Sequence, residues 1–233
     1  MQNLRLNRAT ISQAFWRTIF ESGIWIIKEL ESYHLSKYIP TEYLRNSADY
    51  NTGSISFATT ISLGLATAYF KPSTVIEIGT FIGRSTAAVA QANYLSSFKK
   101  CTIHSCDASN DIALDLSDFC DLTQYGKTKS TSMLKQLQDK QFVADMVVID
   151  GRLEEQDAIL IKEVMGKRSV IFLDDFEGVE KGVANADLLF KYGSQSFTLV
   201  YPPSTELLSE FSMQGSSGLA ALLPTGMIEL TKQ

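Results

Sequence analysis

The chain has 233 residues, a length that suits one domain with one large hydrophobic core. Hydrophobic residues make up 45% and charged residues 20%, which is ordinary for a globular protein, and the formal net charge of -5 argues against nucleic acid as the main partner. The three cysteines show no metal-ligand spacing and no apolar stretch is long enough to span a bilayer. We therefore expect a cytoplasmic protein without a membrane partner.

The N-terminal part of the chain is predicted to be a helical extension. Apolar residues recur at helical spacing over Ile11–Leu30, and a polar, turn-rich stretch follows. We predict a helical extension or lid over residues 1–50 and the main domain over residues 51–233. Trp16 and Trp25 fall on the helix and are interpreted as packing residues; the alternative is a subunit contact, so a homodimer stays open.

After Pro72 the pattern changes to short apolar runs that alternate with helical segments. This alternation predicts a doubly wound α/β fold, with a seven-stranded, mainly parallel sheet covered by helices on both faces. The turn residues at 224–226 separate two further runs and predict a C-terminal antiparallel hairpin. The expected strands are Thr74–Ile78, Cys101–Cys106, Ala144–Ile149, Val170–Leu173 and Phe197–Tyr201, followed by Leu219–Leu223 and Met227–Leu230 in the hairpin.

A strand, a glycine turn and a helix follow one another at Val75–Ser85. Gly79 and Gly83 let the backbone bend and approach a ligand closely, and the helix N-terminus offers free N–H groups to an anion. Asp107 ends the next strand, where a carboxylate can accept hydrogen bonds from both hydroxyls of a ribose. A nicotinamide-binding turn would share this logic but usually reads GxGxxG, whereas these glycines are spaced GxxxG. A structural turn without a ligand is the other alternative, and Glu77 together with Asp107 makes it less favoured.

The segment Glu77-Ile78-Gly79-Thr80-Phe81-Ile82-Gly83-Arg84-Ser85 resembles the first motif of class I S-adenosylmethionine-dependent methyltransferases. It is most similar to the small-molecule O-methyltransferases of the catechol and caffeoyl-CoA type and their bacterial relatives. The resemblance implies that Asp107 binds the ribose of S-adenosylmethionine, and a weaker likeness at 126–130 implies that Ser130 lies near the adenine. The cofactor residues expected within the motif itself are Glu77, Gly79, Thr80, Gly83 and Ser85.

Carboxylates follow two later strands: Asp150 ends one strand, and Asp174 and Asp175 end another. At the carboxyl ends of a parallel sheet they would converge and repel one another unless a cation held them, and oxygen ligands suit magnesium or calcium. The alternative is that they cap a turn and a helix. The resemblance implies a metal site at all three positions, in which the ion lowers the pKa of the hydroxyl being methylated.

Arg152 marks a departure from the relatives, which commonly carry an acid or histidine after the Asp-Gly pair, and in the catechol type a lysine nearby, to remove a proton. Arginine stays charged and cannot act as an ordinary base. We predict that Arg152 recognises an anionic group of the acceptor, with a structural counter-ion as the alternative. Glu154 is a candidate base, but it is equally well explained as a residue at the start of a helix.

Together these patterns predict metal-assisted transfer of a methyl group from S-adenosylmethionine to a hydroxyl of a small, anionic molecule, with Asp150 and Arg152 as the catalytic residues. Two alternatives remain. The first is a cofactor-binding domain that has lost catalysis, which the missing base favours. The second is a methyltransferase that acts on nitrogen or carbon.

Overall fold

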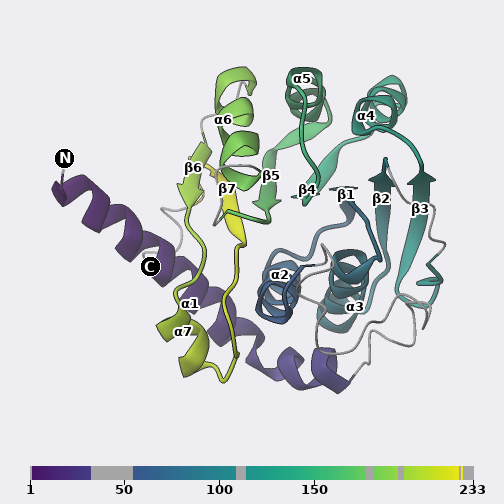
Figure 1. Ribbon diagram of the computed structural model, residues 1–233. Coiled ribbons are helices and arrows are strands. Elements are labelled where there is room, and N and C mark those ends of the chain that lie inside the picture. The colour runs from purple at the N-terminus through teal and green to yellow at the C-terminus, as the bar shows by residue number, and fades with distance from the viewer. Residues whose placement is uncertain are drawn as a thin grey trace.

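The computed structural model describes residues 2–32, 55–108, 114–176, 181–193, 197–225 and 227. Within these ranges it contains seven helices and seven strands (Figure 1). In chain order they are α1 (Gln2–Ser32), α2 (Phe57–Phe70), β1 (Thr74–Ile78), α3 (Arg84–Ser97), β2 (Cys101–Asp107), β3 (Cys120–Gly126), α4 (Ser130–Asp139), β4 (Ala144–Ile149), α5 (Glu155–Glu163), β5 (Met165–Leu173), α6 (Gly182–Tyr192), β6 (Phe197–Val200), α7 (Thr205–Glu210) and β7 (Ala220–Pro224).

The strands form one sheet in the order β3-β2-β1-β4-β5-β7-β6. The pairs from β3 to β5 are parallel, whereas β7 runs antiparallel to both β5 and β6. The predicted fold class is therefore confirmed, including an antiparallel pair at the C-terminal edge. The strand order reverses between β1 and β4, which are neighbours at the centre of the sheet. Doubly wound sheets bind ligands beyond the carboxyl ends of the strands at this point.

Two details of the strand prediction differ from the structure. The partners of β7 are β5 and β6, and residues 228–230 of the expected hairpin lie outside the described residues. The edge strand β3 has no apolar run to mark it, because most of its side chains are only partly covered and its sequence is largely polar. An edge strand is buried less completely than a central one, so its sequence resembles that of a loop.

Helices cover both faces of the sheet (Figure 1). On one face lie α4, α5 and α6, and on the other lie α1, α2 and α3. Side chains of the central strands alternate between two hydrophobic clusters: Val75 and Val148 belong to one, and Ile76 and Val147 belong to the other. Because both faces are buried, these strands read as continuous apolar runs in the sequence.

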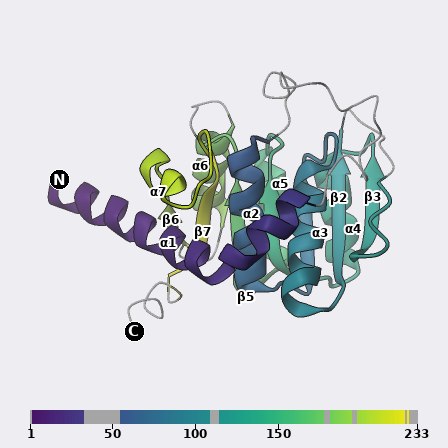
Figure 2. The same ribbon diagram turned by 90° about the horizontal axis from the view of Figure 1, so that it is seen from below.

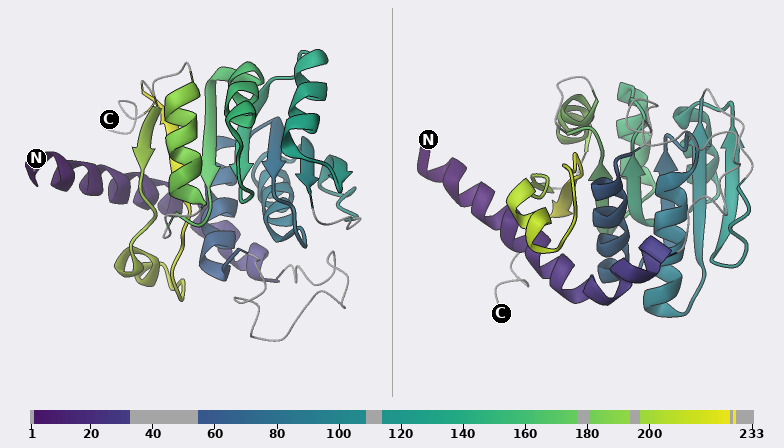
Figure 3. Two further views of the ribbon diagram at one scale, coloured as in Figure 1. Left: turned by 45° about the horizontal axis from the view of Figure 1, so that its top comes forward. Right: turned by 60° about the horizontal axis from the view of Figure 1, so that its bottom comes forward.

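Helix α1 crosses the outer side of α2 and reaches α3 (Figures 2 and 3). Trp16 is fully buried, packs near Phe172 of the sheet, and donates a hydrogen bond from Nε1 to the carbonyl of Tyr201 at 2.7 Å. The packing role expected for Trp16 is thus confirmed, whereas Trp25 is 55% exposed. The division at residue 50 stays a prediction, since residues 33–54 lie outside the described part. No helix among the described residues is long and apolar enough to cross a membrane.

Candidate functional site

A cavity of about 260 Å³ lies beyond the carboxyl ends of β1, β2 and β4. This is the crevice that the strand order predicts, between the loops that leave neighbouring central strands. Its walls come from five segments of the chain that are far apart in sequence. The residues that line it are Ile78, Gly79, Phe81, Cys106, Asp107, Ala108, Thr128, Ser130, Asp150, Gly151, Arg152 and Lys181.

Gly79 brings the turn after β1 against the turn after β4. Its φ is 96°, in the region that favours glycine, and a Cβ at this position would lie 2.6 Å from the nitrogen of Gly151 and 2.9 Å from the carbonyl carbon of Asp150. Both contacts are with backbone, which cannot rotate away. Gly83, with a φ of 82°, caps the N-terminus of α3, and a Cβ there would overlap the side chain of Leu114. Both glycines are therefore required by the turn geometry.

Glu77 supports the glycine turn from behind. Its side chain is buried, and Oε2 accepts hydrogen bonds from the hydroxyls of Thr86 at 2.6 Å and Ser105 at 2.5 Å. The hydroxyl of Thr80 is hydrogen-bonded to that of Ser105. Burial raises the pKa of Glu77, although hydrogen bonds from Ser105, Ser85 and Thr86 oppose the shift. This network ties the end of β1 to β2 and to the first turn of α3.

Three of the predicted cofactor residues lie on the cavity wall: Gly79, Asp107 and Ser130. The other four belong to the buried turn and network behind it, so that their direct contact with a cofactor stays a prediction. They are Glu77, Thr80, Gly83 and Ser85. The Oδ2 atom of Asp107 accepts a hydrogen bond from the backbone N–H of Phe81 at 2.7 Å. The same carboxylate that faces the cavity therefore also fixes the turn after β1.

Lys181, which directly precedes α6, lies among the acidic strand ends. Its Nζ is 2.9 Å from both the backbone oxygen and Oδ1 of Asp150, and 2.6 Å from Oδ2 of Asp175. Asp150 shares the cavity wall with Lys181, whereas Asp174 and Asp175 are not among the lining residues. Lys181 is not among the residues predicted from the sequence, because no motif or spacing connects a lysine there to the ends of β4 and β5.

The electrostatics of this cluster follow from burial and from mutual repulsion. Burial raises the pKa of Asp150 to about 6, against the opposing effect of Lys181. Burial, together with the charges of Asp150 and Asp175, raises the pKa of Asp174 to about 7. Burial alone would lower the pKa of Lys181, but its hydrogen bonds to Asp175 and Asp150 outweigh this and raise it. Lys181 is therefore a firmly protonated ammonium group.

The acidic cluster does not fit a divalent ion with its side chains arranged in this way. Within the described ranges, no three His, Cys, Asp or Glu side chains are grouped so that they could hold a metal. Two of the three predicted ligands, Asp150 and Asp175, already bind the ammonium of Lys181. The metal-ligand roles of Asp150, Asp174 and Asp175 remain a prediction from the sequence.

Arg152 lies on the cavity wall, on a turn that α6 holds in place. The buried side chain of Asn185 accepts a hydrogen bond from the N–H of Leu153 at 3.0 Å and donates one to the carbonyl of Gly151 at 2.8 Å. The interpretation of Arg152 as a residue that faces the acceptor pocket is compatible with this position. Glu154 does not line the cavity; it precedes α5 and lies 3.6 Å from the ammonium of Lys129, at an exposed position.

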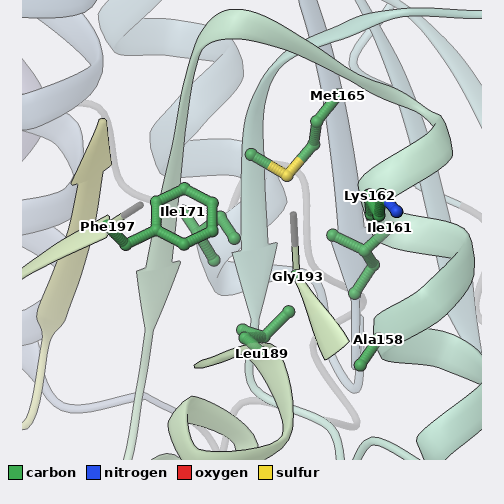
Figure 4. A pocket seen from close by; sticks show the side chains of 8 residues that line it. All are labelled: Ala158, Ile161, Lys162, Met165, Ile171, Leu189, Gly193 and Phe197. Atoms are coloured by element: carbon green, nitrogen blue, oxygen red, sulfur yellow. The ribbon is translucent and has the colours of Figure 1, made fainter. Parts of the chain in front are cut away.

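A second, much smaller hollow lies between α5, α6 and the strands β5 and β6 (Figure 4). Its volume of about 10 Å³ is room for roughly one water molecule, and its lining is apolar except for Lys162. Met165, Ile171 and Phe197 surround it from the sheet side (Figure 4). We interpret it as a packing defect and not as a ligand site.

No protein-family model matches the chain, and no curated protein matches its sequence. Solved structures do match. The O-methyltransferase TomG from Streptomyces achromogenes, involved in tomaymycin synthesis and solved with S-adenosylmethionine, is 12% identical with a TM-score of 0.52, over 84% of this chain and 96% of that one. An O-methyltransferase from Bacillus cereus, solved with S-adenosylhomocysteine, is 14% identical with a TM-score of 0.51, over 83% of this chain and 99% of that one. The chain therefore has the Rossmann-like fold of class I S-adenosylmethionine-dependent methyltransferases, with O-methyltransferases among its structural neighbours.

Proposed function

We propose that the chain binds S-adenosylmethionine and transfers its methyl group to a hydroxyl of a small, anionic molecule. The observation that carries this proposal is the cavity at the sheet's switch point, whose wall joins Asp107 on one side to Asp150 and Arg152 on the other. A nucleoside and an acceptor would have to share such a crevice for their reacting atoms to meet. The fold shared with two O-methyltransferases supports the same proposal.

The residues present fit a nucleoside cofactor. The carboxylate of Asp107 can accept hydrogen bonds from two ribose hydroxyls, and Ser130 lies on the same wall at the start of α4. Gly79 presents backbone without a side chain on the same wall. When bound, S-adenosylmethionine supplies an electrophilic methyl group. The protein then has to hold the acceptor oxygen in line with that group and exclude water.

Arg152 and Asp150 are the residues that we assign to the acceptor. The guanidinium of Arg152 can bind a carboxylate or phosphate through paired hydrogen bonds, which suits an anionic acceptor. The carboxylate of Asp150 shares this wall and can accept a hydrogen bond from the hydroxyl to be methylated. Magnesium assistance stays a prediction from the resemblance; the contacts of Lys181 argue against it, so the proposal includes no metal-dependent step.

The second candidate function is a cofactor-binding domain without catalysis. Arg152 favours it, because an arginine takes the place where a proton acceptor was expected. A methyltransferase that acts on nitrogen or carbon remains the third possibility. These candidates differ in the product formed and share the cofactor, so they are separated by incubating the protein with labelled S-adenosylmethionine and small hydroxylated acids. Cofactor binding without labelled product from any acceptor class would favour the non-catalytic domain.

The cofactor itself is tested by calorimetry with S-adenosylhomocysteine. We expect micromolar binding, about -8 kcal/mol, and a loss of more than about tenfold in Asp107→Ala, because hydrogen bonds to a charged carboxylate are removed. The matched control is Asp121→Ala, which removes the same charge from an exposed position on β3. Binding of NAD with no binding of S-adenosylhomocysteine would overturn the proposal.

We also propose a cytoplasmic location and leave a homodimer as a testable possibility. The three cysteines are free and buried, and burial raises the pKa of Cys106 to about 12, so that none resembles a thiol built for disulfide exchange.

Ile24 and Trp25 of α1 are each more than half exposed, which makes this helix the surface to examine for a subunit contact.

A further inference from the structure

Lys181 uses all the hydrogen-bonding capacity of its ammonium group inside the protein. An ammonium has three N–H donors and no acceptor. Three oxygens lie within hydrogen-bonding distance of Nζ: the backbone oxygen and Oδ1 of Asp150, each at 2.9 Å, and Oδ2 of Asp175 at 2.6 Å. The side chain of Asp150 is 9% exposed and that of Lys181 is 26% exposed, so the contact between these two groups is largely shielded from water, whereas the side chain of Asp175 is 53% exposed.

The position of the ammonium joins the ends of two neighbouring strands. Asp150 follows β4 and Asp175 follows β5, and these strands pair in parallel up to Ile149 and Leu173. The backbone N–H of Asp174 also donates to the carbonyl of Ile149 at 3.0 Å. The ends of β4 and β5 are thus held side by side by the sheet itself, and the repulsion between the carboxylates of Asp150 and Asp175, which both contact Nζ, has to be offset by positive charge.

A divalent ion and the ammonium of Lys181 compete for the same oxygens. A magnesium or calcium ion would need several oxygen ligands at about 2.0–2.6 Å, and two of the available carboxylates are already bonded to Nζ. We propose that Lys181 is the resident cation of this site, and that it takes the place of a divalent ion at the ends of β4 and β5. Lys181 is then a positioning residue, which holds Asp150 on the wall of the cavity.

One consequence rests on the proposed function: methyl transfer by this chain would run without a divalent ion and would survive chelation. The place of the lysine among the carboxylates does not depend on methyl transfer. Ion binding and cofactor binding can therefore be measured separately, and S-adenosylhomocysteine calorimetry on the same variants shows which of the two ideas has failed.

The test removes the ammonium and asks whether a metal site appears. Binding of Mn²⁺ to the full chain is followed by electron paramagnetic resonance, and the melting temperature is measured with and without Mg²⁺, for wild type, Lys181→Met and the control Lys135→Met. Lys135 is exposed on α4, and its replacement changes the net charge equally. We expect wild type and the control to bind Mn²⁺ weakly and without saturation. Lys181→Met should melt at a lower temperature, bind Mn²⁺ roughly tenfold more tightly or better, and recover stability with Mg²⁺.

Two outcomes would overturn the proposal. The first is saturable Mn²⁺ binding to wild type that disappears in Asp175→Asn, because the site would then hold a metal with the lysine in place. The second is a Lys181→Met protein with wild-type stability and unchanged Mn²⁺ binding, because the ammonium would then not offset the repulsion. If Lys181→Met does not fold, Lys181→Gln, which keeps donors but loses the charge, is measured for the same two quantities. A gain of Mn²⁺ binding on loss of the ammonium indicates that Lys181 occupies the place of a divalent ion, because replacing a lysine with only a structural role would create no ion site.

Discussion

Replacing Gly79 by alanine should disturb both the stability of the fold and the cavity. A residue other than glycine in the left-handed region costs about 1–2 kcal/mol, and Gly79 has a φ of 96°. The added Cβ would also lie 2.6 Å from the nitrogen of Gly151, and overfilling of this kind costs about 1–3 kcal/mol. We therefore expect Gly79→Ala to lower the free energy of unfolding by about 2–5 kcal/mol.

Gly215 provides a matched control for the backbone contribution. Its φ is 91°, close to that of Gly79, but a Cβ at this position would have no atom within 4 Å. Gly215→Ala should therefore show the conformational cost alone, about 1–2 kcal/mol. Both substitutions reduce the entropy of the unfolded chain equally. The difference between their losses of unfolding free energy therefore measures the cost of the close contact between the turns after β1 and β4.

The assay is urea unfolding of both variants, together with calorimetry of S-adenosylhomocysteine. The alanine side chain at position 79 can be accommodated only if Gly151 and Asp150 move. Gly79→Ala should therefore also weaken the binding of S-adenosylhomocysteine, whereas Gly215→Ala should leave it unchanged. Equal losses of unfolding free energy in the two variants would refute the reasoning. They would mean that the turns separate freely and that their contact does not shape the cavity.

Two further predictions concern the charged wall and the buried carboxyl group beside it. Arg152→Ala should raise KM for an acidic acceptor by the equivalent of about 1.5–3 kcal/mol, while S-adenosylhomocysteine affinity and the melting temperature stay nearly unchanged. The control is Arg168→Ala, at an exposed position. A large drop in the melting temperature of Arg152→Ala would instead mark Arg152 as a structural counter-ion. The pKa of Asp174 is raised from 3.8 to about 7, so its favourable contribution to stability is complete below about pH 4 and is lost as the pH rises through 7. Relative to wild type, Asp174→Asn should thus become more stable between pH 4 and pH 8, by up to about 4 kcal/mol in urea unfolding; a difference that does not vary with pH would contradict the assignment.

Much of the fold was predictable because the central strands are buried on both faces. Runs such as Thr74–Ile78 and Ala144–Ile149 are mostly apolar and lack regular alternation, and each coincides with a strand of the structure. The edge strand β3 escaped prediction because exposure to solvent allows polar residues at most of its positions. At the C-terminal edge, the apolar run at 219–223 predicted β7, but its pairing with β5 and β6 depends on contacts between distant segments.

The sequence by itself determined the glycine turn and the acid that follows the next strand. Gly79 and Gly83 are dictated by local backbone geometry, and Asp107 by its place at the end of β2, and such constraints are legible in a linear pattern. Only the tertiary structure decided what neutralises the acidic strand ends. Lys181 is 31 residues from Asp150, and its ammonium reaches that carboxylate because the start of α6 packs against the turn that follows β4. A charge pair of this kind needs only proximity in space, which leaves no spacing or periodicity in the sequence to reveal it.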